Sequence, residues 1–163
     1  MAVGAATDPY QPAEGRYKLT RACLEAFSDA SNPFSIITRG PMVVRDLDVL
    51  VEASRRADVS VTFSVPTLDE EVWRRTEPST AHPRQRLKAV QTLVEAGVNA
   101  RVGMAPILPG ISDRPEQLRE VVRAARTTSR SCSGRSEMPG KIGAIPTRAL
   151  TPASTSVFTA FSR

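Results

Sequence analysis

The chain has 163 residues, of which 40% are hydrophobic and 5% aromatic, enough for the core of one ordinary domain. Its net charge of +5 arises in residues 126–163, which hold six basic residues and a single acid, Glu137, whereas acids and bases balance in 1–125. The sequence has no uninterrupted apolar run of about 18 residues, which excludes a membrane span. It also lacks a secretory signal and a CxxC spacing of its two cysteines, which predicts a reducing, cytoplasmic setting.

Short apolar runs and amphipathic stretches alternate along the first 126 residues. The predicted strands are 1–5, 34–38, 59–65 and 100–107, and the predicted helices are 16–30, 44–57, a short turn near 69–74, 83–96 and 114–126. Strict alternation predicts an α/β fold with parallel strands and right-handed crossovers. Four βα units are too few to close an eight-fold barrel, which leaves a partial barrel or an open sheet.

The spacing of apolar residues predicts which face each helix buries. The expected face of the first helix consists of Leu19, Ala22, Cys23, Ala26 and Phe27. The expected face of the second consists of Leu47, Leu50, Val51 and Ser54. Cys23 is therefore interpreted as a core residue.

The strand 59–65 alternates strictly between apolar and polar side chains. Its polar members, Ser60, Thr62 and Ser64, point to one face of the sheet. A central parallel strand that is covered on both faces should be apolar throughout, so the polar row predicts a face that lines a wet or ligand-filled interior. The alternative is an antiparallel edge strand that faces solvent.

Loops at the carboxyl ends of the predicted strands are rich in proline and glycine. These loops are 7–14, 38–41, 64–71 and 105–113. Ligands bind at this edge in parallel α/β proteins, so the four loops together predict a shared site. The acids at 69–71 are interpreted as first-turn residues that complement a helix dipole.

Residues 127–163 differ in kind from the body. They are rich in Ser, Thr, Arg and Pro, with no sustained period, and we expect them to form a low-complexity basic tail outside a domain of residues 1–126. The tail is either disordered or a stretch translated out of frame. Nucleic-acid binding is less favoured, because aromatic residues do not interleave with the arginines before Phe158.

Several motifs in the body resemble the radical S-adenosylmethionine (radical SAM) superfamily, in its spore photoproduct lyase-like or "DNA repair photolyase" branch. The resemblance rests on TDPYQPAE at 7–14, YKLTR at 17–21, SIITRGPMVVRDLDVL at 35–50, VSVTFSVPTLDEEVWRRTEPSTAHPRQRL at 59–87 and GMAPILPGISD at 103–113. It implies a partial (βα)6 barrel, incomplete at both ends here, that binds S-adenosylmethionine and a 4Fe–4S cluster. The family cleaves this cofactor reductively to a 5′-deoxyadenosyl radical. The substrate is unknown, with nucleic acid suggested by the branch alone.

The resemblance also implies cofactor-binding residues. Arg39 matches a basic residue beside the cofactor carboxylate, a pairing that can be bidentate. Thr62 and Ser64 match positions that face the ribose and methionine part. The remaining expected contacts are Thr7 and Asp8 near the methionine amino group, Tyr10 in the same loop, and Pro106 and Ile107 beside the adenine.

One departure from the family concerns the metal. The family binds its cluster through three cysteines spaced CxxxCxxC, and cluster irons require thiolates. This chain has only Cys23 and Cys132, and its one histidine, His82, makes no metal site. The chain is thus expected to be a fragment of a radical SAM protein, inactive alone. The alternatives are a non-catalytic half-barrel completed by a partner and, less favoured, a metal-independent barrel enzyme.

Overall fold

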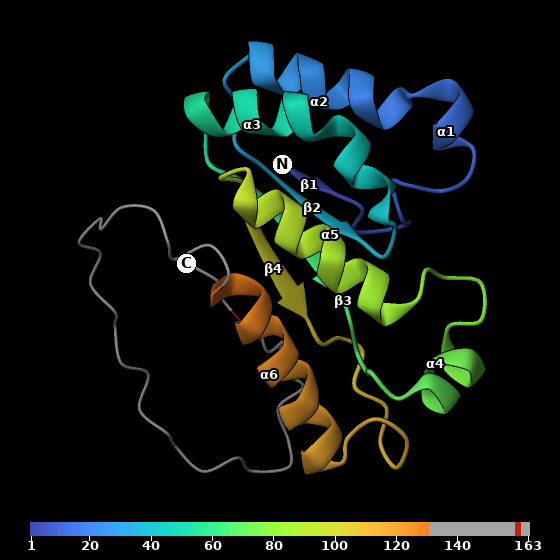
Figure 1. The fold of residues 1–163 in the computed structure, drawn as a ribbon. Helices are drawn as coiled ribbons and strands as arrows, with labels where there is room; N and C mark the ends of the chain where they lie inside the picture. The colour runs from blue at the N-terminus through green and yellow to red at the C-terminus, as the bar shows by residue number, and fades with distance from the viewer. Residues whose placement is uncertain (131–158, 161–163) are drawn as a thin grey trace.

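The computed structural model describes residues 1–130 and 159–160, which form one sheet with helices packed on it (Figure 1). The strands are β1 (Ala2–Val3), β2 (Phe34–Thr38), β3 (Val59–Ser64), β4 (Asn99–Gly103) and β5 (Thr159–Ala160). The helices are α1 (Glu14–Tyr17), α2 (Leu19–Asp29), the 3-10 helix η1 (Pro41–Asp46), α3 (Leu47–Arg56), α4 (Glu70–Thr76), α5 (Pro83–Glu95) and α6 (Pro115–Arg130). Strands β1 to β4 are parallel and lie in chain order, and β5 pairs antiparallel with β4. The predicted α/β fold with a parallel sheet is confirmed.

The two faces of the sheet differ in chemistry. Cross-strand rows on one face are Ser35, Ser60 and Asn99, then Ile37, Thr62 and Arg101, all half-buried or exposed. Side chains on the opposite face form the core with residues of α2, α3, α5 and α6. Figure 1 shows α5 in front of β3 and alongside β4. The helices of the described part therefore cover one face, and the other stays polar.

The position of β3 decides between the two interpretations of its polar row. This strand pairs in parallel with β2 on one side and β4 on the other, so it is not an antiparallel edge strand. Ser60 and Thr62 lie half-buried on the face without helices, as the alternation predicted. The next member, Ser64, is buried at the strand end.

The first predicted helix differs from expectation in extent and in its buried face. It is interrupted at Lys18, whose φ of 52° is left-handed, so that α1 and α2 are separate. Leu24 and Ser28 are buried, whereas Leu19 is 67% exposed. The predicted face was therefore wrong, and Cys23 is exposed rather than in the core. Apolar residues lie on both stripes of α2, and tertiary contacts decide which stripe is buried.

Hydrogen bonds to Glu14 fix the rotation of α2 about its axis, and so the face that it buries. Its Oε2 accepts a hydrogen bond from Thr20 N at 2.9 Å, and its Oε1 accepts one from Arg21 N at 3.4 Å. Lys18, at the N-cap position of α2, supplies no side-chain cap. A buried carboxylate from α1 thus caps the first turn of α2, where amide groups otherwise lack partners.

The second predicted helix begins as the 3-10 helix η1 and continues as α3. Val49, Leu50 and Ala53 form its buried face, about one residue away from the expected one. The other expected residues, Leu47, Val51 and Ser54, are only partly buried. The hydroxyl of Ser54 donates a hydrogen bond to Leu50 O. Leu50 is the residue on which prediction and structure agree fully.

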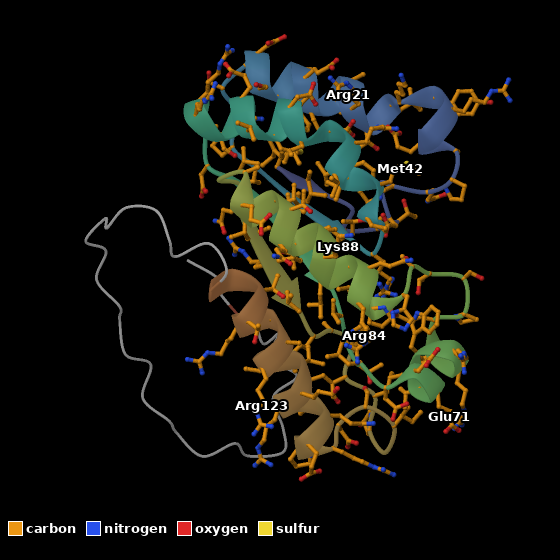
Figure 2. The ribbon with its side chains drawn as sticks, in the orientation of Figure 1. Arg21, Met42, Glu71, Arg84, Lys88 and Arg123 are labelled. Carbon is orange, nitrogen blue, oxygen red and sulfur yellow. The ribbon has the colours of Figure 1, made fainter. Side chains whose placement is uncertain are left out.

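Helices α4 and α5 lie close to their predicted positions. Asp69 caps α4 by accepting hydrogen bonds from Glu71 N and Val72 N through Oδ1, which confirms its predicted place at a helix start. His82 caps α5 by accepting from Arg84 N through Nδ1 at 3.2 Å. Arg84 and Lys88 project from the exposed face of α5 (Figure 2).

The C-terminal elements end at other residues than predicted. Strand β4 stops at Gly103, so Pro106 and Ile107 belong to the loop that follows. Helix α6 continues to Arg130, past the boundary expected at 126. Of the predicted tail, residues 131–158 and 161–163 lie outside the described residues. None of the helices in the described part combines the length and apolar character needed to cross a bilayer.

Candidate functional site

A cavity of about 190 Å³ opens where β2, β3 and β4 end. Its walls come from the loops after these strands, from α4 and from the loop between α4 and α5. The lining residues are Arg39, Pro66, Thr67, Val72, Thr76, Glu77, Thr80, Pro106, Leu108 and Ser112. The wall is partly apolar, with hydroxyl groups and one pair of opposite charges, at the edge where ligands bind in parallel sheets.

The loop after β1 reaches this edge through Asp8. Its Oδ1 accepts hydrogen bonds from Thr38 Oγ1 at 2.7 Å and from Tyr10 N at 2.9 Å, and its Oδ2 accepts one from Arg39 N at 2.7 Å. Thr7, the neighbouring predicted residue, is exposed. Asp8 therefore fixes the backbone of Arg39.

Tyr10 lies in the core rather than on the cavity wall. It is 5% exposed, and its hydroxyl donates to Asp46 Oδ2 at 3.1 Å. Burial, together with the nearby Asp46 carboxylate, raises the pKa of Tyr10 well above its usual value. Tyr10 anchors the loop that carries Asp8.

Arg39 lines the cavity with a partly exposed side chain. Its Nε donates to Glu77 Oε1 at 2.7 Å, and this side chain is 40% exposed while that of Glu77 is 9% exposed. Within the described residues, Nη1 and Nη2 of Arg39 make no hydrogen bond. These terminal groups are the two-pronged donor that recognises a carboxylate or phosphate.

Ser64 and Thr62 occupy different environments although they share a strand. The hydroxyl of Ser64 donates to Ala105 O at 2.7 Å and so holds the loop after β4. Thr62 stays on the polar face, where a Cβ on Gly103 would come within 3.0 Å of its Cγ2. Glycine at 103 therefore leaves space beside Thr62.

The predicted adenine contacts lie in the loop after β4. Pro106 lines the cavity, and Ile107 is 38% exposed. The cavity thus brings together two of the predicted residues, Arg39 and Pro106. Asp8 bonds the backbone of Arg39, and Ser64 bonds Ala105, the residue before Pro106. The other predicted residues do not line the cavity.

A buried arginine and its partners were not predicted from the sequence. Arg86 is fully buried, and it donates to Ser64 O at 2.7 Å, to Ala81 O at 2.8 Å and to Thr80 Oγ1 at 2.5 Å. Its Nη2 also lies 2.8 Å from Glu77 Oε2, an ion pair whose angles fall outside those of a hydrogen bond.

Burial lowers the pKa of Arg86, and the Glu77 carboxylate acts against this shift. A signal for Arg86 was present in the sequence. The residue sits in line with Ala89, Val90 and Leu93 on the apolar face of α5, where a charge needs a buried partner.

A metal centre has no counterpart in the described part of the chain. No three His, Cys, Asp or Glu side chains converge there as metal ligands. Cys23 is exposed on α2, and Cys132 lies outside the described residues.

Comparisons with known proteins agree with the resemblance at the level of the superfamily. The family model of the radical SAM superfamily matches residues 2–124. An uncharacterized protein of Mycobacterium tuberculosis is 38% identical over 122 residues, which are 75% of this chain and 36% of that protein. An uncharacterized protein of Acidianus two-tailed virus is 34% identical over 71% of this chain and 36% of its own length.

An uncharacterized protein of Methanocaldococcus jannaschii is 28% identical over 68% of this chain and 41% of its own length. The matched part of this chain thus spans well under half the length of these relatives. No solved structure matches significantly. The family match covers most of the chain, and the chain therefore belongs to the radical SAM superfamily.

Proposed function

We propose that this chain forms the S-adenosylmethionine-binding edge of a partial (βα)6 barrel. The observation that carries the proposal is Arg39, whose terminal guanidinium groups have no hydrogen bond within the described residues while the side chain lines the cavity. In the proposed complex Arg39 binds the methionine carboxylate, and Pro106 lies beside the adenine. Asp8 keeps the backbone of Arg39 in place.

The size of the cavity limits what it can hold. At about 190 Å³ it is smaller than the roughly 300–1,000 Å³ of pockets that enclose a whole drug-sized ligand. The cavity therefore does not enclose the whole cofactor, whose two ends contact Arg39 and Pro106 on its wall. The rest extends over the polar face of the sheet, where Ser60 and Thr62 offer hydroxyl groups.

The residues of this chain do not fit a 4Fe–4S cluster. The sequence has two cysteines, and cluster binding in the family needs three closely spaced thiolates. We therefore propose that the chain alone binds the cofactor without cleaving it. Reductive cleavage, and a DNA lesion as substrate of the intact enzyme, are proposed from the resemblance to the spore photoproduct lyase-like branch.

Titration calorimetry with S-adenosylmethionine tests the proposal. We expect R39A to weaken binding by about 10- to 100-fold, because hydrogen bonds to charged groups contribute about 1.5–3 kcal/mol. The matched control is R55A, which removes an exposed arginine paired with Glu52 on α3 and leaves affinity unchanged. Equal affinity of R39A and the intact chain contradicts the proposed site.

Iron analysis after reconstitution with ferrous iron and sulfide tests the second part of the proposal. We expect less than one iron atom bound per chain. Four irons per chain with the absorbance of a thiolate-bound cluster would refute it.

A second candidate function is a non-catalytic half-barrel completed by a partner, and an exposed apolar stripe on α2 offers a surface for association. Leu19 is 67% exposed, and Ala22, Cys23 and Ala26 on the same side of α2 are exposed as well. Sedimentation of the pure chain separates the candidates. A defined complex whose assembly is abolished by L19E supports the second, and a stable monomer contradicts it.

A further inference from the structure

Arg39 is held at both ends by carboxylates from different loops. Asp8 accepts from its backbone N, and Glu77 accepts from its side-chain Nε, each at 2.7 Å. Asp8 precedes β2 in the chain, while Glu77 follows α4, 38 positions after Arg39. Two loops far apart in sequence thus converge on one residue, one on its backbone and the other on its side chain.

Glu77 is itself fixed by the core. Its Oε2 lies 2.8 Å from Nη2 of Arg86, and Arg86 is anchored on the carbonyl of Ser64 at the end of β3. The side chain of Glu77 is 9% exposed and that of Arg86 is fully buried. The Glu77 carboxylate is therefore held in place, because moving it away from Arg86 would leave the buried guanidinium without its charged partner.

The contact on Arg39 uses the Nε edge of the guanidinium. An arginine has five N–H donors in a rigid fork, and a carboxylate on Nε leaves the end formed by Nη1 and Nη2 available. Asp8, Arg39, Glu77 and Arg86 together carry two positive and two negative charges. The charges of the network therefore cancel in the absence of a ligand. Neither carboxylate occupies the Nη end of Arg39, so that end stays available to an anionic ligand.

We propose that Glu77 is a positioning residue that orients the Nη end of Arg39 toward the carboxylate of the bound cofactor. This inference rests on the proposed function and adds to it the residue that sets carboxylate selectivity. Preorganised donors cost little reorganisation on binding, so a freely rotating Arg39 would select a carboxylate poorly.

The test compares two ligands that differ only in the carboxylate, S-adenosylmethionine and decarboxylated S-adenosylmethionine. We expect the intact chain to prefer S-adenosylmethionine by about tenfold or more, the effect of one charge-assisted pair. In E77Q this preference falls to about threefold or less, with affinity for the decarboxylated ligand unchanged. The control is E70Q, which removes one carboxylate from the exposed Glu70–Arg74 pair and keeps the preference.

A second readout does not depend on a ligand. In the ¹⁵N spectrum of arginine side chains, the Nε–H of Arg39 should exchange slowly with water in the intact chain and in E70Q, and quickly in E77Q. A purely structural Glu77 would lower the unfolding midpoint of E77Q without changing ligand preference.

The outcomes separate this inference from the proposed function. A chain that binds S-adenosylmethionine while folded E77Q retains the full carboxylate preference overturns the inference alone. An intact chain that binds neither ligand overturns the proposed function and the inference with it. Loss of preference in E77Q together with fast exchange at Arg39 supports both.

Discussion

At the residue scale, three carboxylates join separate elements of the fold through hydrogen bonds and ion pairs. Asp8 satisfies three donors, Glu14 caps α2, and Glu77 joins two arginines. The family resemblance implied that Asp8 is a contact of the methionine amino group. The structure gives its oxygens to the protein itself, which a sequence motif cannot reveal because the donors come from other strands.

Glu14 makes the stability of the chain depend on pH. Burial acts to raise the pKa of Glu14, but hydrogen bonds from Thr20 N, Arg45 and Arg21 N outweigh burial and hold this pKa below its usual value of 4.5. A depressed pKa in the folded state means that the unfolded chain binds the proton first. The stabilisation is therefore complete above about pH 4.5 and is lost as the pH falls through the lower, folded value.

We expect E14Q to lower the free energy of unfolding at pH 7 by about 1–3 kcal/mol, because Arg45 loses a buried charged partner. The difference between E14Q and the intact chain should shrink as the pH falls from 5 to 3. Urea denaturation at a series of pH values measures it, with the exposed Glu95 as E95Q control. A constant difference across this range contradicts the role of Glu14.

Strands and well-capped helices were predictable at the element scale, but helix rotations were not. β2 and β3 match their predicted ranges within one residue, because short apolar runs between turn residues leave little choice. In α2 and α3 apolar residues lie on more than one side of the helix. Contacts such as Glu14 to Thr20 N choose between them, and such contacts join separate elements.

Close backbone approach at Gly4 gives a test of how β1 joins β2. Gly4 has a φ of +90°, and an added Cβ would collide with Ile37 O and lie 2.8 Å from Pro9 Cδ. Gly97 has a φ of +86° with nothing within 4 Å of an added Cβ. The two glycines share a positive φ, which is strained for any other residue, and they differ in available space.

We expect G97A to cost about 1–2 kcal/mol, the penalty of a left-handed conformation alone. G4A should cost about 2–5 kcal/mol, because overpacking against β2 adds to that penalty. Midpoints of urea denaturation measure both variants. Equal losses of unfolding free energy in the two variants would show that Gly4, at the end of β1, does not approach Ile37 of β2 as closely as described.

At the scale of the whole molecule, helices cover one face of the sheet within residues 1–130, and the other face there is mainly polar. The alternating pattern of β3 predicted this asymmetry, since each side chain reports its own face. The site was harder to predict because Glu77 and Arg86 act through partners on other elements. Arg86 is also buried where an arginine is rarely found.

A second cavity allows a sharp test of where the cofactor binds. It measures about 370 Å³ and is thus larger than the candidate site, but it lies at the opposite edge of the sheet. Its lining includes Ala57, Asp58, Gly97 and Asn99, at the ends of helices and the starts of strands. Ligands in parallel sheets bind at the carboxyl edge, so size alone does not make it the site.

Hydrogen–deuterium exchange of the intact chain with and without S-adenosylmethionine tests the central claim most directly. We predict that the ligand slows exchange in residues 38–41, 64–68 and 105–112, the loops around Arg39, and leaves residues 54–59 and 94–99 unchanged. Protection confined to 54–59 and 94–99, or no protection at a saturating ligand concentration, would contradict it.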